Sequence, residues 1–141
     1  MIIRTAISTD APSLCNICRN DLGYDCRTDL IKERIEKLDT EREAVFVAEK
    51  DGIVVGYIQV ELYRTLYFET MANILGLATD SNYRRQGIGK ALVEKTEEWA
   101  SGKGAKIMRL NSGASREGAH AFYRNLGYGS EKEQLRFLKE L

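Results

Sequence analysis

Two glycines separated by one residue, Gly87 and Gly89, follow two arginines and stand at the start of a helical pattern. Just before them, the apolar run from Ile74 to Ala78 predicts a buried strand. In a strand–loop–helix unit, free backbone N–H groups and the positive end of the helix dipole can hold a phosphate. Glycine lets an anion approach the backbone because it has no side chain. A phosphate-bearing ligand is therefore the first hypothesis.

The chemistry of the loop excludes two other kinds of phosphate-binding loop. A P-loop needs serine or threonine after its lysine, whereas Lys90 is followed by Ala91. A dinucleotide-binding turn needs a third glycine and a parallel βαβ unit; the third glycine is missing, and the sequence pattern leads us to expect no parallel βαβ unit here. Two interpretations remain: glycines that only shape a turn, or amides that surround a pyrophosphate with Arg84, Arg85 and Lys90 supplying positive charge.

Coenzyme A fits the second interpretation because it joins a pyrophosphate to a long, thin pantetheine arm. Such an arm needs an extended hydrogen-bonding partner. The strand edge at Leu77, Ala78 and Thr79 ends directly before the loop and would provide one.

The elements that position this loop are predicted from apolar periodicity and turn residues. Asp10 is expected to cap the first helix, and Asp51-Gly52 is a hairpin turn signal. Strands are expected at 2–7, 44–49, 53–63, 70–79, 106–110 and 135–138, and helices at 10–22, 28–38, 87–102 and 116–126. This order predicts one α+β domain over residues 1–141, with a mixed, mostly antiparallel sheet and about four helices.

The composition limits the classes of partner. The 141 residues include 21 basic and 21 acidic side chains, so the overall basic field of a nucleic-acid binder is missing. The sequence contains no apolar run of membrane-spanning length, and its first residues do not resemble a signal peptide. We therefore expect a cytoplasmic protein that binds neither nucleic acid nor membrane, and the sequence leaves a homodimer open.

No metal site is expected. Cys15 and Cys18 are spaced like a zinc or redox pair, but zinc would need a second pair of ligands and the only histidine, His120, is far along the chain. With Cys26 they are expected to be free thiols.

The pattern Arg84-x-x-Gly87-x-Gly89 after an apolar strand resembles the acetyl-CoA signature of the GNAT superfamily of N-acetyltransferases. Residues 119–128, Ala-His-Ala-Phe-Tyr-Arg-Asn-Leu-Gly-Tyr, look like the second motif of that family. The predicted order of elements also fits, and the resemblance covers almost the whole chain.

The resemblance implies an N-acetyltransferase that moves an acetyl group from acetyl-CoA to a primary amine of a small molecule or peptide, by direct attack in a ternary complex. It implies that loop amides hold the pyrophosphate and that the preceding strand pairs with the pantetheine. The residues assigned to acetyl-CoA are Leu77, Ala78, Thr79, Arg84, Arg85, Gln86, Gly87, Ile88, Gly89, Lys90 and Arg116.

The resemblance also implies that Tyr123 is the general acid for the departing CoA thiolate. A phenol with a pKa of about 10 stays protonated at neutral pH and can donate to the sulfur. The alternative for Tyr123 is packing at the edge of an apolar stripe.

The chain departs from the family pattern at two places. Arg116 stands where many members have an asparagine that contacts the pantetheine. No acidic residue lies between Glu69 and Asp80, where many relatives place a general base, so Glu69 or Glu61 is the candidate base and a water relay is the alternative. His120 could assist the amine, or lie on the helix surface.

The acceptor is expected to contact the segment between the first two helices. Tyr24 and Asp25 are candidate substrate residues there, with Tyr67 or Glu69 as further candidates. Two functions of other classes remain open. One is a non-catalytic acetyl-CoA-binding sensor or regulatory module, and the other is an interaction domain without a ligand.

Overall fold

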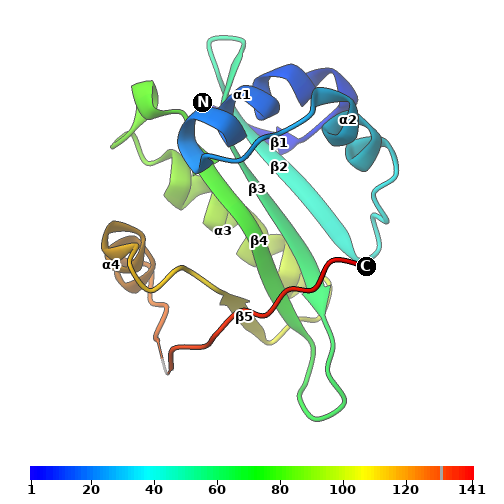
Figure 1. The fold of residues 1–141 in the computed structure, drawn as a ribbon, viewed down its shortest axis with the longest axis vertical. Coiled ribbons are helices and arrows are strands. Elements are labelled where there is room, and N and C mark those ends of the chain that lie inside the picture. Colours follow the sequence, from blue (N-terminus) through cyan, green and yellow to red (C-terminus); the bar gives the residue numbers. More distant parts are fainter. Residues whose placement is uncertain (131) are drawn as a thin grey trace. The chain divides into compact units, whose positions relative to one another are not determined.

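The structure is a computed structural model that describes residues 1–130 and 132–141. These residues form two compact units, residues 1–110 and 111–141. The first unit contains β1 (Ile2–Thr5), α1 (Ala11–Leu22), α2 (Thr28–Glu36), β2 (Glu43–Lys50), β3 (Ile53–Tyr63), β4 (Met71–Thr79), α3 (Ile88–Gly102) and β5 (Ile107–Leu110), and the second contains α4 (Glu117–Asn125) (Figure 1).

The five strands of the first unit form one sheet in the order β1-β2-β3-β4-β5. Neighbouring strands run antiparallel from β1 to β4, and β5 runs parallel to β4. β4, α3 and β5 therefore form a parallel βαβ unit around the glycine loop, so the expectation that no such unit is present there is wrong. The hairpin between β2 and β3 turns at Asp51 and Gly52, whose φ angles are 52° and 77°. Both residues therefore have a left-handed backbone conformation, as the Asp-Gly signal predicts. The predicted mixed, mostly antiparallel sheet with four helices is confirmed.

Helices cover both faces of the sheet in the first unit, α1 and α2 on one face and α3 on the other (Figure 1). Side chains alternate between the faces along β3. Tyr57 packs against the cluster that includes Leu14 and Ile17 of α1. On the opposite face α3 approaches so closely that a Cβ added at Gly56 would lie 3.0 Å from Cγ2 of Ile88. This close packing fixes the start of α3 over the middle of the sheet.

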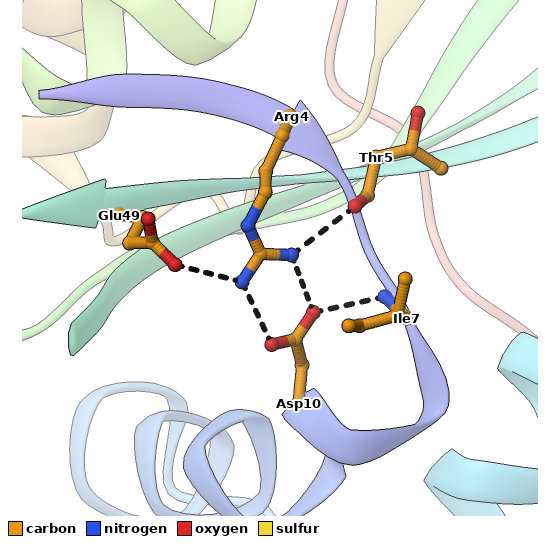
Figure 2. A network of polar contacts seen from close by, with 5 residues as sticks. All are labelled: Arg4, Thr5, Ile7, Asp10 and Glu49. Atoms are coloured by element: carbon orange, nitrogen blue, oxygen red, sulfur yellow. Dashed lines mark hydrogen bonds and ion pairs between the residues drawn. The ribbon is translucent and has the colours of Figure 1, made fainter. Parts of the chain in front are cut away.

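Arg4 and Asp10 connect the first strand to the first helix (Figure 2). The Arg4 guanidinium donates to both Asp10 carboxylate oxygens at 2.8 and 2.9 Å, and to Glu49 on β2 at 3.2 Å. The Asp10 carboxylate also accepts from the Ile7 backbone N–H at 2.9 Å. The predicted helix cap at Asp10 is wrong in its chemistry: Asp10 stands at the N-cap position of α1, but its side chain makes no cap hydrogen bond to that helix.

Replacing Asp10 should destabilise the fold. Its side chain is only 7% exposed, so Asp10→Asn weakens a mostly buried ion pair and should lower the free energy of unfolding by about 2–3 kcal/mol at pH 7. The hydrogen bonds from Arg4 hold the pKa of Asp10 below its ordinary value of 3.8. A lowered native pKa means that this contribution is complete above pH ~4 and is lost as the pH falls further. Urea unfolding across pH measures it.

The matched control for this prediction is Glu36→Gln, which removes an exposed carboxylate from α2. We expect this variant to unfold at the urea concentration of the wild type. Equal stability of Asp10→Asn and the wild type at pH 7 would show that the network in Figure 2 contributes nothing.

The predicted strand at 135–138 is wrong. Residues 132–141 contain no helix or strand, and the side chains of Leu135, Phe137 and Leu138 are 83%, 86% and 77% exposed. Alternating apolar residues form a strand only where a neighbouring edge accepts their backbone hydrogen bonds. Within the second unit, the described residues include no strand whose edge residues 132–141 could pair with.

Candidate active site

The glycine loop joins the end of β4 to the start of α3. Ser81–Tyr83 form a short 3-10 turn, and the chain then makes an exposed turn through Arg84–Gly87. Arg85 and Gly87 have φ angles of 63° and 77°, in the left-handed region. Glycine adopts this conformation without strain, whereas a side chain with a branched Cβ does not. Position 87 therefore favours glycine for two reasons: its positive φ angle and the access that it gives an anion to the backbone.

Side chains from two other elements hold the loop. The Asp21 carboxylate of α1 accepts from the Ser81 backbone N–H at 3.1 Å and lies 3.8 Å from Nη2 of Arg84. On β2, Nζ of Lys50 donates to Oε1 of Gln86. Sequence reasoning missed Asp21 and Lys50 because they lie 60 and 36 positions from their partners, and no local pattern indicates such contacts.

The start of α3 presents unused backbone donors. Its first backbone bond runs from the Ala91 N–H to the Gly87 carbonyl at 3.0 Å. Because helix bonds join each N–H to the carbonyl four residues earlier, the N–H groups of Ile88, Gly89 and Lys90 have no partner within the helix. These donors lie at the positive end of the helix dipole. Arg84, Arg85 and Lys90 are exposed beside them, so the loop has the donors and positive charge that a pyrophosphate requires.

The strand edge that leads to this loop is only partly paired. β4 pairs with β3 from Met71 to Thr79 but with β5 only from Met71 to Ile74. A β-bulge interrupts the β3–β4 register: Gln59 lies opposite Gly76 and Val60 opposite Ile74. Within the described chain, 75–79 therefore has a sheet partner on one side alone. Leu77, Ala78 and Thr79 lie on this edge, which suits an extended pantetheine arm.

In the second unit, Tyr123 lies in an aromatic cluster formed by α4 and the residues just after it. Its ring lies 5.1 Å from that of Phe122 and 6.0 Å from that of Tyr128, both edge-on. Burial raises the pKa of the Tyr123 phenol above its ordinary value of 10.0, and the charge of Arg116 opposes this rise. The raised pKa keeps the phenol protonated across the neutral range, which a proton donor requires.

His120 and Arg116 lie at the start of α4. Nε2 of His120 is 2.8 Å from the Gly113 carbonyl, so one ring nitrogen is engaged with the loop before the helix. Arg116 occupies the N-cap position and makes no side-chain cap hydrogen bond. This arrangement gives His120 a local structural contact, and its catalytic role stays a prediction, as does the cofactor role of Arg116.

The two candidate bases lie at different places along the sheet. Glu69 is exposed in the loop before β4, at the end of that strand farthest from the glycine loop. Six residues, or about 20 Å of extended chain, separate Glu69 from the bulge at Leu75, where the one-sided edge of β4 begins. Glu61 is half-buried on β3, and its register partner Asn73 lies two residues before the bulge. The role of either glutamate as a base stays a prediction.

The α1–α2 connection carries the predicted substrate residues Tyr24 and Asp25, both exposed. The Cys26 carbonyl at its end accepts from Nη2 of Arg19 at 2.8 Å and from Sγ of Cys15 at 3.4 Å. The three cysteines are free thiols, as the sequence predicts. The described residues contain no cluster of three or more histidine, cysteine or acidic side chains placed to hold a metal ion. They also contain no helix long and apolar enough to cross a bilayer.

Comparison with known proteins gives the family. Residues 11–128 match the acetyltransferase (GNAT) family model. An uncharacterized N-acetyltransferase of Chlorobaculum tepidum is 30% identical over 135 residues, 93% of this chain and 77% of that protein. The aminoalkylphosphonate N-acetyltransferase of Salmonella typhimurium is 28% identical over 99% of this chain and 90% of its own. The chain spans 43% of the length of an uncharacterized N-acetyltransferase of Methanocaldococcus jannaschii, at 33% identity over 68% of this chain.

Solved structures have the same fold. A transcriptional regulator from Bacillus halodurans superposes with a TM-score of 0.86 at 27% identity, covering 98% of this chain and 99% of its own. The structure of AAC(6')-Iy in complex with the bisubstrate analogue CoA-S-monomethyl-acetylneamine has a TM-score of 0.84 at 16% identity, covering 99% and 98%. The glycine loop, the half-paired edge of β4 and these matches agree: the chain belongs to the GNAT family of acetyltransferases.

Proposed function

We propose that this protein binds acetyl-CoA along the β4 edge and the glycine loop and transfers its acetyl group to a primary amine of a small molecule or peptide. The observation that carries the proposal is that the one-sided edge of β4 and the glycine loop are continuous along the chain. The one-sided edge of β4 leads directly into a loop whose amides and cations suit a pyrophosphate. A ligand with a thin arm joined to a pyrophosphate can use both.

Two comparisons support the acetyl donor and the kind of acceptor. One structure of the same fold holds a bisubstrate analogue built on CoA. The Salmonella relative is named for an aminoalkylphosphonate, which is a small amine. These names support a small-molecule acceptor for this chain. Because the proposal also covers peptide amines, the amine panel should include them.

The proposed reaction is a direct transfer. Bound acetyl-CoA supplies an activated thioester carbonyl carbon. The neutral amine nitrogen forms a bond to that carbon as the carbon–sulfur bond breaks, and the bonding pair leaves with the sulfur. Tyr123 donates a proton to the departing sulfur, and the amine loses one proton to a base or to water, so charge and protons balance. Glu61 is our candidate for that base because of its place beside β4.

A non-catalytic acetyl-CoA-binding module is the second candidate, since no carboxylate stands on β4 itself. The two functions share the cofactor site and differ in the product. A thermal shift with acetyl-CoA tests the shared part, and release of the CoA thiol over a panel of amines separates the two.

We expect acetyl-CoA at one hundred times its Kd to stabilise the protein by about 2.7 kcal/mol, or about 8 °C in Tm. Thiol release should follow when an accepted amine is added. Sodium sulfate at the same concentration is the control for non-specific anion binding, because it lacks the pyrophosphate and the pantetheine arm, and it should shift the Tm far less. No thermal shift with acetyl-CoA would contradict the proposal, and a shift without thiol release from any amine would favour the sensor.

A further inference from the structure

Four half-buried side chains cross three neighbouring strands on one face of the sheet. Glu61 and Tyr63 lie on β3, Asn73 on β4 and Arg109 on β5. The register pairs Glu61 with Asn73, and Asn73 with Arg109. Alternation along β3 puts Glu61 and Tyr63 on the face of Tyr57, which is the face that α1 covers. We call Glu61, Tyr63, Asn73 and Arg109 the polar row.

The Asn73 amide separates the two charges of this row. Its Nδ2 donates to Oε2 of Glu61 at 3.4 Å, and its Oδ1 accepts from Nη1 of Arg109 at 2.8 Å. The Arg109 guanidinium also lies 4.4 Å from the centroid of the Tyr63 ring, a cation–π contact. A carboxylate and a guanidinium are thus held on opposite sides of one amide instead of pairing with each other.

Both charged groups keep unused hydrogen-bonding capacity. A guanidinium has five N–H donors, and within the described chain Arg109 uses one of them in a side-chain hydrogen bond. From the residues that the structure describes, Glu61 accepts a single long hydrogen bond, from Asn73. Neither has an oppositely charged group within 4.0 Å among the described residues. The row can therefore offer an acceptor and several donors to a ligand.

The row lies beside the place where β4 and β5 separate. Asn73 and Arg109 are a register pair, and the next pair, Ile74 and Leu110, is the last one. The proposed function places the thioester arm along 75–79, so the row adjoins the end of that arm, and this step rests on that proposal. An acceptor on the row would hold its amine close to the acetyl group.

We infer that the polar row binds the acceptor, and that the acceptor is a small primary amine carrying an anionic group, a carboxylate or a phosphonate, a few bonds away. Arg109 binds the anionic group with two of its free N–H donors, a charge-assisted pairing. Glu61 accepts an N–H from the amine. The backbones of Glu61 and Arg109 are two strand spacings apart, about 10 Å, and both side chains lean toward Asn73, so one small molecule can reach both.

The same charges disfavour other amines. A polycationic acceptor would bring a second positive charge toward Arg109 without an anion to pair with it, which is unfavourable on a half-buried surface. A neutral alkylamine would leave Arg109 unused. The row thus predicts a preference that can be measured without knowing the physiological acceptor.

The test compares 2-aminoethylphosphonate and β-alanine with ethanolamine and spermidine in the thiol-release assay. For the wild type we expect kcat/KM to be at least 10-fold higher for the two acidic amines, equivalent to about 1.4 kcal/mol. Arg109→Gln should reduce this ratio to about 3-fold or less by raising KM for the acidic amines, with ethanolamine unaffected. Arg34→Gln removes an exposed cation from α2 and should keep the wild-type ratio.

A binding measurement covers the case in which no amine is acetylated. With CoA in place of acetyl-CoA, the acidic amines should raise the Tm of the wild type and not that of Arg109→Gln. Absence of turnover with this shift present would refute the proposed function and support the polar row as a binding site for acidic amines. Equal use of acidic and neutral amines by the wild type, or an unchanged preference in a folded Arg109→Gln, would overturn the acceptor site and leave the acetyltransferase proposal standing.

Discussion

Gly87→Val should abolish the thermal shift that acetyl-CoA gives to the wild type. Gly87 has a φ of 77°, and a β-branched residue in that conformation costs roughly 1–3 kcal/mol. The loop is expected to relieve this strain by changing its backbone, which moves the amides of Ile88 and Gly89. No atom of the described residues lies within 4 Å of a Cβ added at Gly87, so that part of the fold has no clash to accommodate. The variant should be folded and unable to bind.

The matched control is Gly104→Val. Gly104 has a φ of 88°, is exposed, and has equally empty space around an added Cβ. It follows the opposite end of α3, about 22 Å of helix from the glycine loop. This variant should have a lower Tm without ligand and a normal acetyl-CoA shift. A normal acetyl-CoA shift in Gly87→Val would contradict the assignment of the pyrophosphate to this loop, whatever the result for Gly104→Val.

Tyr123→Phe should lower kcat by about 100-fold or more while leaving the Kd for acetyl-CoA nearly unchanged. Positioned proton transfer is typically worth roughly 10²–10⁴ in rate. The phenylalanine ring keeps the edge-on packing with Phe122 and removes only the hydroxyl. Because the pKa of Tyr123 is raised, the wild-type rate should not fall through ionisation of this phenol anywhere below pH 10. Initial rates from pH 6 to pH 9.5, with calorimetric titration of acetyl-CoA, measure both effects.

Tyr128→Phe is the control for this substitution, because its ring packs 6.0 Å from that of Tyr123 in the same cluster. It should keep wild-type turnover. If Tyr123→Phe also kept it, the tyrosine would be a packing residue, and the proton for the sulfur would have to come from water.

The fold could be predicted where local signals and tertiary contacts agree. The Asp51-Gly52 hairpin is an example, since both residues adopt the left-handed conformation that their types favour. The strand expected at 135–138 failed because an apolar pattern carries no information about a neighbouring edge. The helix cap predicted for Asp10 is wrong for a related reason. The residue type indicates a helix cap, but the main partner of the Asp10 side chain is Arg4, on the preceding strand.

The strand, loop and helix that we propose as the cofactor site could be predicted from the sequence because they consist of contiguous residues. A strand, two glycines and two arginines lie within twenty positions, and the structure joins them as expected. The polar row was not visible. Glu61, Asn73 and Arg109 are brought together only by strand register. The bulge at Leu75 sets the register in which Asn73 of β4 lies opposite Glu61 of β3. Nothing in the local sequence marks that bulge.

We propose that acetyl-CoA bound at this loop is an acetyl donor and not only a ligand. The most direct measurement incubates the protein with acetyl-CoA and the best amine of the panel, and quantifies free CoA thiol and N-acetyl product together. We expect the two to appear in equal amounts and to exceed the amount of protein many times over, with neither formed by Gly87→Val. Thiol release without acetylated amine, or tight binding with neither product, would contradict the claim.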